Sequence, residues 1–230
     1  ENGYTTAQIG KWHTGTDTGA NRDWDHQIVW NRPRYQHNSG NYFYDQLIET
    51  NGGKPKLTKG YSTDNYTNWA EDFIRGDHRD AEKPWYLWVC YGAVHGPFTP
   101  PHRHRDSYPN ITVPTPADIF PPRPGKPKWM QSVEYWVKDA NGNPEMKGGQ
   151  FGGKTVEGAK SIHGNSLTGW VRQYHQGVLG LDDVVGRLVS AVEESGQLDN
   201  TLIVFTSDQG FSWGQHGFAT KLAPYDANIR

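Results

Sequence analysis

The sequence predicts an α/β fold built on a mostly parallel sheet. Apolar, strand-like runs occur at residues 3–10, 85–91 and 202–206. A long amphipathic helix lies between the last two runs, because apolar residues recur there at steps of three and four: Trp170, Tyr174, Val178, Leu181, Val185, Leu188 and Val192. Strand, helix and strand in this order are typical of βαβ units, whose strands are parallel.

The remaining predicted elements are shorter. Residues 14–44 are polar and aromatic without a clear period, which predicts a long irregular connection. A short strand is predicted at 44–49, followed by a turn at 51–53. A helix is predicted from about 65 to 75, with Asp64 as its N-cap. The runs 85–91 and 202–206 are apolar on both faces, as buried parallel strands are.

The stretch from about 96 to 165 differs in composition from the rest of the chain. It holds most of the 15 prolines and a Gly-rich part at 148–158. Because a loop of this length inside a domain is usually functional or flexible, we interpret it as a long irregular insertion. Within it, residues 133–137 are predicted to form half of a hairpin that turns at Asn141-Gly142.

Composition excludes several classes of function. A hydrophobic fraction of 34% over 230 residues suits a globular core, and the net charge of -2 gives no pull toward nucleic acid. No apolar run is long enough to span a membrane, and no signal peptide is visible. The chain opens without an initiator Met, which we interpret as an incomplete chain. The single Cys90 excludes a disulfide framework and a Cys-based zinc site.

Polar residues with chemical capability follow the first two apolar runs. Lys11 and His13 come at the end of the first, and His95 follows the second, before Gly96-Pro97. Ligands bind outside the carboxyl ends of the strands in open α/β sheets. These two ends and the end of the third run, at Asp208-Gln209, therefore predict one shared site, at which Lys221 is also expected to lie. Lys suits an oxyanion such as sulfate or phosphate, and His95 could act as a general acid. The alternative interpretation is a solvent-exposed Lys beside a structural His whose hydrogen bonds are made within the fold.

The third apolar run ends at Asp208-Gln209. A carboxylate beside an amide oxygen is a pair of hard ligands suited to Ca²⁺ or Mg²⁺, although a simple turn has the same composition. Lys221 follows the stretch Gly214-Gln-His-Gly217 and, taken by itself, is an ordinary surface Lys.

Three segments together resemble the type I sulfatases. Gly3-Tyr-Thr-Thr-Ala-Gln-Ile-Gly-Lys-Trp-His-Thr-Gly15 resembles the second signature of this family. Ala93-Val-His-Gly-Pro97 is similar to its central His motif, and the region from Tyr174 through Gly210 to Lys221 and Tyr225 is similar to its later metal-binding segment. The resemblance implies an alkaline-phosphatase-like, mostly parallel sheet with helices on both faces. The chain would then be the middle and C-terminal portion of a catalytic domain, over residues 1–230.

The resemblance also implies a role for each site residue. Lys11 would bind a sulfate oxygen, and His13 would contact the nucleophile and assist its turnover. His95 and Lys221 would hold the sulfate and the leaving oxygen, with His95 as the proton donor. Asp208 and Gln209 would be Ca²⁺ ligands, with Gln in place of the more usual Asn. The activity implied is hydrolysis of a sulfuric ester, on a sulfated small molecule or glycan, in a periplasmic or secreted protein.

One family feature does not occur in these residues. The nucleophile of the type I sulfatases is a formylglycine made from Cys or Ser in a Cys/Ser-x-Pro-x-Arg motif, which lies upstream of the Gly-Tyr-Thr segment. We therefore expect the nucleophile and the early Asp-Asp metal ligands to be absent from this chain, and the chain alone to be inactive. Two alternatives stay open: a single-metal phosphonate or phosphodiester hydrolase of the same superfamily, and a non-catalytic remnant that binds sulfated glycans.

Overall fold

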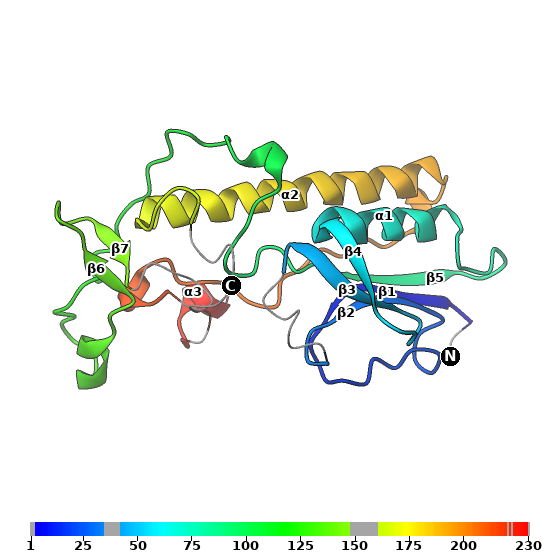
Figure 1. The fold of residues 1–230 in the computed structure, drawn as a ribbon, viewed down its shortest axis with the longest axis horizontal. Coiled ribbons are helices and arrows are strands. Elements are labelled where there is room, and N and C mark those ends of the chain that lie inside the picture. Colours follow the sequence, from blue (N-terminus) through cyan, green and yellow to red (C-terminus); the bar gives the residue numbers. More distant parts are fainter. Residues whose placement is uncertain (1–2, 35–41, 148–160, 220, 222, 230) are drawn as a thin grey trace. The chain divides into compact units, whose positions relative to one another are not determined.

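The computed structural model describes residues 3–34, 42–147, 161–219, 221 and 223–229 (Figure 1). The chain divides into two units. Unit 1 comprises residues 1–95 and 177–202, and unit 2 comprises residues 96–176 and 203–230. The helix α2 (Leu167–Glu194) contributes residues to both units.

Unit 1 is built on a five-stranded mixed sheet. Its strands are β1 (Thr5–Trp12), β2 (His26–Asn31), β3 (Tyr44–Thr50), β4 (Lys56–Tyr61) and β5 (Trp85–Cys90), in the order β4-β3-β2-β1-β5. The pairings of β1 with β2 and with β5 are parallel, while β2-β3 and β3-β4 are antiparallel. The parallel part therefore comprises the three strands around β1. The predicted α/β class is confirmed, in a mixed form.

The helices of unit 1 cover one face of this sheet. The helix α1 (Ser62–Arg75) and the second half of α2 both pack against the face that carries Ile9 and Leu87 (Figure 1). The predicted N-cap at Asp64 is wrong: the cap residue is Tyr61, without a side-chain capping bond, and Asp64 lies inside the first turn. There its carboxylate is still favourably placed toward the positive end of the helix dipole.

The opposite face of β5 is open to solvent. Tyr86 and Trp88 are 51% and 46% exposed, and Trp24 packs beside both of them, with ring centroids 6.2 and 6.0 Å away. The prediction that this strand is buried on both faces is therefore wrong. The helices cover only the alternate residues, such as Leu87 and Val89, because successive side chains of a strand point to opposite faces.

Gly10 explains why β1 and β5 approach closely. Its φ is +115°, and a Cβ atom at this position would lie 2.1 Å from the carbonyl oxygen of Cys90. Any other residue would push β1 away from the edge strand β5, close to the carboxyl ends of both strands. This local constraint lies one residue before Lys11 and thus fixes the backbone that carries it.

Unit 2 has little regular structure besides the first turns of α2. Its described residues include the 3₁₀ turns η2 (His102–His104), η3 (Lys128–Ser132) and η5 (Gln215–Gly217), and the short helix α3 (Asp226–Ile229). The predicted hairpin is present as β6 (Trp136–Lys138) and β7 (Pro144–Met146). Aromatic and aliphatic side chains make its core: Phe98, Ile119, Trp136, Met146, Leu167, Trp170, Val171 and Ala219.

Three further differences from the sequence prediction concern strands. Residues 202–206 are in no strand, and the side chains of Leu202, Val204 and Phe205 are 89%, 74% and 71% exposed. The buried strand predicted there is wrong. By contrast, β2 and β4 lie in stretches that the sequence did not identify as strands, and β2 is buried along its whole length. Among the described residues, no helix has the length and apolar character that a membrane crossing needs.

Candidate functional site

The candidate site of unit 1 lies at the carboxyl ends of its three parallel strands. β1 ends with Lys11 and Trp12, and His13 follows directly. β5 ends at Cys90, five residues before His95. β2 ends at Asn31 and is followed by Arg32, whose backbone N–H donates to the carbonyl oxygen of Trp12 at 3.1 Å. Parallel pairing thus brings three polar strand ends to one edge of the sheet.

The ring of Tyr42 forms the centre of this cluster. The Lys11 ammonium lies over it at 4.9 Å from the ring centroid, and the Arg32 guanidinium lies at 5.6 Å. The imidazole of His95 stacks on the same ring, with centroids 3.9 Å apart and planes within 5°. Tyr42 reaches this edge because the antiparallel strand β3 begins where β2 ends. One buried aromatic ring therefore contacts two cations and an imidazole.

His13 joins the cluster through Arg32. The guanidinium Nη1 of Arg32 lies 2.8 Å from Nε2 of His13. His13 itself is exposed, whereas Lys11, Arg32 and His95 are half-buried. Three of the four predicted catalytic residues, Lys11, His13 and His95, thus lie at one edge of the sheet, around a residue that the sequence analysis did not single out.

The electrostatics of this edge favour an anion. Burial raises the pKa of the Tyr42 hydroxyl, and the charge of Arg32 only partly opposes this shift, so the phenol stays neutral at physiological pH. Burial also raises the pKa of Cys90 to about 11, which keeps this thiol protonated and unreactive. Lys11 and Arg32 therefore supply positive charge next to neutral groups, an arrangement that can bind an oxyanion.

The other predicted site residues lie in unit 2. Asp208 is exposed, while Gln209 and Lys221 are half-buried. The next residue, Gly210, donates its N–H to the carbonyl oxygen of Asn228 at 3.1 Å, which ties the Asp208-Gln209 turn to α3. Because these residues and the edge around Tyr42 belong to different units, the convergence of all six predicted residues stays a prediction.

The fit of a metal to Asp208 and Gln209 can be judged from their donors. A carboxylate and an amide oxygen are ligands that Ca²⁺ prefers, but Ca²⁺ takes six to eight oxygens. In the part of the chain that the structure describes, no three His, Cys, Asp or Glu residues gather as a metal site. The donor type of this pair therefore fits Ca²⁺, while their number is too small for a site of their own.

The loop before Lys221 carries an oriented histidine that the sequence analysis did not predict. Nδ1 of His216 lies 2.5 Å from a carboxylate oxygen of Asp118, and the backbone N–H of His216 donates to the other oxygen at 2.9 Å. The imidazole also packs on Tyr225, with ring centroids 4.1 Å apart. These contacts lower the pKa of Asp118, although its partial burial acts in the opposite direction. Both ends of the Lys221 loop are thereby held together.

Comparison with known proteins decides which family this arrangement represents. The family model described as Sulfatase matches residues 1–229. The chain belongs to the sulfatase family. It is 31% identical over 261 residues to the N-acetylglucosamine-6-O-sulfatase of Bacteroides thetaiotaomicron, which covers 97% of this chain and 45% of that protein. It is 28% identical over 240 residues to an extracellular sulfatase homologue of Caenorhabditis elegans, which covers 100% of this chain and 29% of that protein.

A solved structure supports the fold. A structure of a protein in complex with its substrate D-glucosamine-2-N,6-O-disulfate matches with a TM-score of 0.76 at 27% identity, over 99% of this chain and 52% of that chain. The chain thus spans about half the length of that protein, and less than half of the two curated relatives. The predicted family is confirmed, and so is the α/β fold of its members.

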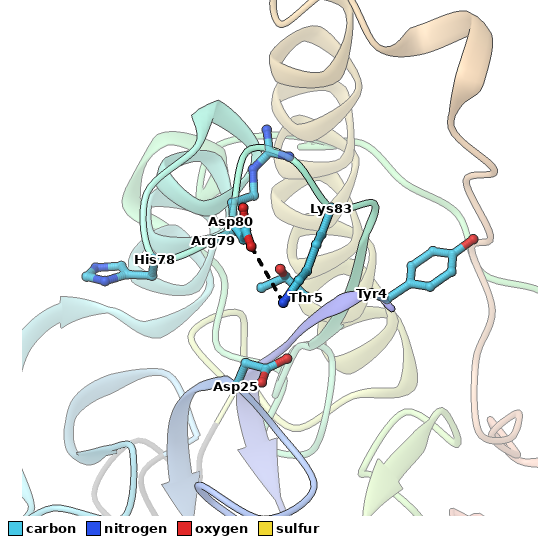
Figure 2. A pocket seen from close by; sticks show the side chains of 7 residues that line it. All are labelled: Tyr4, Thr5, Asp25, His78, Arg79, Asp80 and Lys83. Atoms are coloured by element: carbon cyan, nitrogen blue, oxygen red, sulfur yellow. Dashed lines mark ion pairs between the residues drawn. The ribbon is translucent and has the colours of Figure 1, made fainter. Parts of the chain in front are cut away.

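A pocket of about 410 Å³ lies away from the candidate site of this sulfatase chain (Figure 2). Tyr4 and Thr5 line it at the start of β1, which is the end of the strand opposite to Lys11. Two of its charged groups pair with each other: Lys83 lies 3.5 Å from Asp80, as the dashed line in Figure 2 marks. The carboxylate of Asp25 accepts hydrogen bonds from the backbone N–H and the hydroxyl group of Thr6. We assign this pocket no role.

Sequence reasoning missed Arg32, Tyr42 and Asp118 as parts of the two clusters. Arg32 and Tyr42 lie in the stretch 14–44, which was interpreted as an irregular connection. The buried run Ile28-Val29-Trp30 is the signal that could have revealed β2, and with it the strand end that carries Arg32. Asp118 lies in a loop 98 residues from His216, and no local pattern connects the two.

Proposed function

We propose that the protein hydrolyses sulfate esters of carbohydrates. The observation that carries this proposal is the cluster of Lys11, His13 and His95 around Tyr42, at the carboxyl edge of the parallel strands. Such a cluster suits a tetrahedral oxyanion and a proton donor beside it. Membership of the sulfatase family and the names of the relatives, which include an N-acetylglucosamine-6-O-sulfatase, favour a sulfated sugar as the substrate.

Each predicted catalytic residue of the chain has one role in the proposed reaction. Lys11 binds a non-bridging sulfate oxygen, and the resemblance assigns Lys221 a second contact to the sulfate. His95 donates a proton to the leaving oxygen, so that the sugar departs as a neutral alcohol. The stacking of His95 on Tyr42 fixes the plane of its imidazole, which aims the proton along one direction. His13 assists the turnover of the sulfated intermediate.

The proposed reaction also needs a formylglycine nucleophile and a Ca²⁺ ion. A formylglycine would supply the oxygen nucleophile, and the 230 residues contain no Cys/Ser-x-Pro-x-Arg segment from which it could arise. Asp208 and Gln209 would hold one side of a Ca²⁺ ion, with the remaining ligands supplied by other carboxylates. We further propose a periplasmic or secreted location, which the extracellular sulfatase homologue among the relatives supports.

The test compares three substrates with the protein that the source gene encodes. Glucosamine 6-sulfate, glucosamine 6-phosphate and an aryl phosphodiester are offered, and released sulfate, phosphate or phenol is measured. We expect sulfate release, reduced by about 10²–10⁴ in His95→Ala, as for loss of a general acid. Lys54→Ala removes an exposed lysine and serves as the control, with unchanged turnover.

Each other outcome favours a different function. Faster cleavage of the phosphodiester would favour the single-metal phosphodiester hydrolase. Binding of sulfated sugar without any turnover would favour the glycan-binding alternative. The 230-residue chain by itself should release no sulfate, because it holds no group that can become the nucleophile. Turnover of an aryl sulfate by this chain, abolished in His95→Ala, would contradict the assigned mechanism.

A further inference from the structure

Arg32 contacts two members of the candidate site without any role in the function proposed above. Its guanidinium Nη1 lies 2.8 Å from Nε2 of His13, and its charged end lies 5.6 Å from the centroid of the Tyr42 ring. Its backbone N–H donates to the carbonyl oxygens of Trp12 and Trp30, both at 3.1 Å. The residue is thus fixed by the sheet at its backbone and by the site at its side chain.

The contact between Arg32 and His13 determines where the imidazole carries its proton. A guanidinium has only donors and stays protonated in proteins. An imidazole nitrogen at 2.8 Å from it must therefore be the acceptor, without a proton of its own. A neutral imidazole has one N–H and one acceptor nitrogen, so the proton of His13 must sit on Nδ1. A fully protonated His13, with donors on both nitrogens, would break this hydrogen bond.

Arg32 differs from the arginines that serve surface ion pairs in the same unit. Arg22 pairs with Asp17 at 3.0 Å and with Asp23 at 2.7 Å, and its side chain is exposed. Among the described residues, Arg32 forms no ion pair with a carboxylate, and its Nε is a buried donor without a hydrogen-bond partner. The guanidinium instead lies near the ring of Tyr42, the same ring that the Lys11 ammonium approaches. A surface role in stability does not explain this placement.

We propose that Arg32 is a positioning residue that holds His13 as a neutral imidazole with its proton on Nδ1. The proposal rests on the proposed function, in which His13 assists turnover. The bond leaves Nδ1–H as the donor that His13 offers to an oxygen atom at the reacting centre. Arg32 thereby sets both the orientation and the tautomer of His13, as the hydrogen bond on one ring nitrogen does for the other.

Nitrogen NMR of the chain with labelled histidine tests the tautomer directly. In the wild type, Nε2 of His13 should show the shift of an unprotonated nitrogen, and Nδ1 that of a protonated one. Arg32→Met removes every donor while keeping an unbranched stem over Tyr42, and should give a mixture of tautomers. Arg32→Lys retains a charged donor and should restore much of the wild-type pattern. Arg22→Met removes the same charge elsewhere in unit 1 and should leave His13 unchanged.

Kinetics of the protein that the source gene encodes give a second readout. Arg32→Met should lower kcat by about ten- to hundredfold, the usual effect of losing an orienting partner, with KM changed less than about threefold. A proton on Nε2 in the wild type would overturn the proposal by itself, whether or not Arg32→Met folds. An unchanged tautomer in a folded Arg32→Met variant would overturn it as well.

Failure of the inference and failure of the proposed function give different results. If the Nδ1–H tautomer depends on Arg32 but no sulfate ester is cleaved, Arg32 positions His13 for another reaction and the proposed function is wrong. If sulfate esters are cleaved while His13 carries its proton on Nε2, the proposed function stands and Arg32 has no such role.

Discussion

Substitution of Gly217 by Ala should destabilise unit 2 far more than a glycine substitution usually does. A Cβ atom at Gly217 would lie 2.0 Å from Nη2 of Arg123 and 2.5 Å from its Cζ. Arg123 is 1% exposed, and its guanidinium donates to the carbonyl oxygens of Asp118, Ile119 and Met130 at 2.7, 2.6 and 2.5 Å. The methyl group of Ala can fit only if this guanidinium leaves its carbonyl partners.

The magnitude follows from two contributions. The φ of Gly217 is +81°, and a left-handed conformation costs an L-residue about 1–2 kcal/mol. Losing two of the charged hydrogen bonds of Arg123 costs about 1.5–3 kcal/mol each, which adds roughly 3–6 kcal/mol. Gly142 is the matched control, because its φ is +84° and no atom lies within 4 Å of its hypothetical Cβ. Gly142→Ala should therefore lower the free energy of unfolding only by the cost of the left-handed conformation, about 1–2 kcal/mol.

Hydrogen exchange is the suitable assay, because a chain of two units need not unfold in one step. The backbone N–H of His216 bonds to Asp118, so its protection reports on this loop. Gly217→Ala should accelerate its exchange much more than Gly142→Ala does. In an Arg123→Met background, Gly217→Ala should lower the free energy of unfolding only by the cost of its left-handed backbone conformation. An equal cost of Gly217→Ala in both backgrounds, or a cost equal to that of Gly142→Ala, would refute the reasoning.

Three further predictions concern charge. Tyr42→Leu removes the ring that contacts Lys11 and His95, and should weaken sulfate binding about three- to thirtyfold as measured by calorimetry. Tyr42→Phe keeps the ring and should change the sulfate affinity less than about twofold. The 230-residue chain should bind Ca²⁺ only weakly, because two side chains cannot complete its shell; a submicromolar site lost in Asp208→Ala would contradict this. Burial lowers the pKa of His26 to about 4, below its unfolded value of 6.5, so the stability it contributes is present above pH 6.5 and is lost as the pH falls toward 4. Urea titrations between pH 4 and 7 should show this loss in the wild type and much less of it in His26→Phe.

The elements that the sequence predicted well are those with a long or continuous apolar pattern. α2 begins at Leu167, as its periodic apolar residues indicate, and β1 and β5 match their apolar runs. β2 was missed because only three apolar residues, Ile28, Val29 and Trp30, mark it between polar neighbours. β4 was missed because Lys56 to Tyr61 is largely exposed and carries little pattern. Pairing with β3, which is not a local property, makes β4 a strand.

A continuous apolar run predicts burial only where a second layer covers the strand. The sequence of β5 gives no means of distinguishing Leu87, which packs under the helices, from Tyr86 and Trp88, which are half-exposed on the other face. The run Leu202 to Phe205 is an extreme case, since it has a strand composition without a strand partner among the described residues. An apolar composition indicates a preference for burial, but whether a strand is buried depends on which other segments of the protein pack against it.

The candidate site was predictable in its strand ends and not in its centre. Lys11, His13 and His95 lie at or shortly after the ends of β1 and β5, and parallel pairing is enough to bring such residues to one edge. Tyr42 required knowledge of an antiparallel strand, since only β3 running against β2 returns the chain to the same edge. The ring of Tyr42 lies against Lys11, Arg32 and His95, which come from or follow the three parallel strands. The residue that organises the site therefore comes from the connection with the least pattern. Loops positioned by a rigid sheet commonly carry such residues.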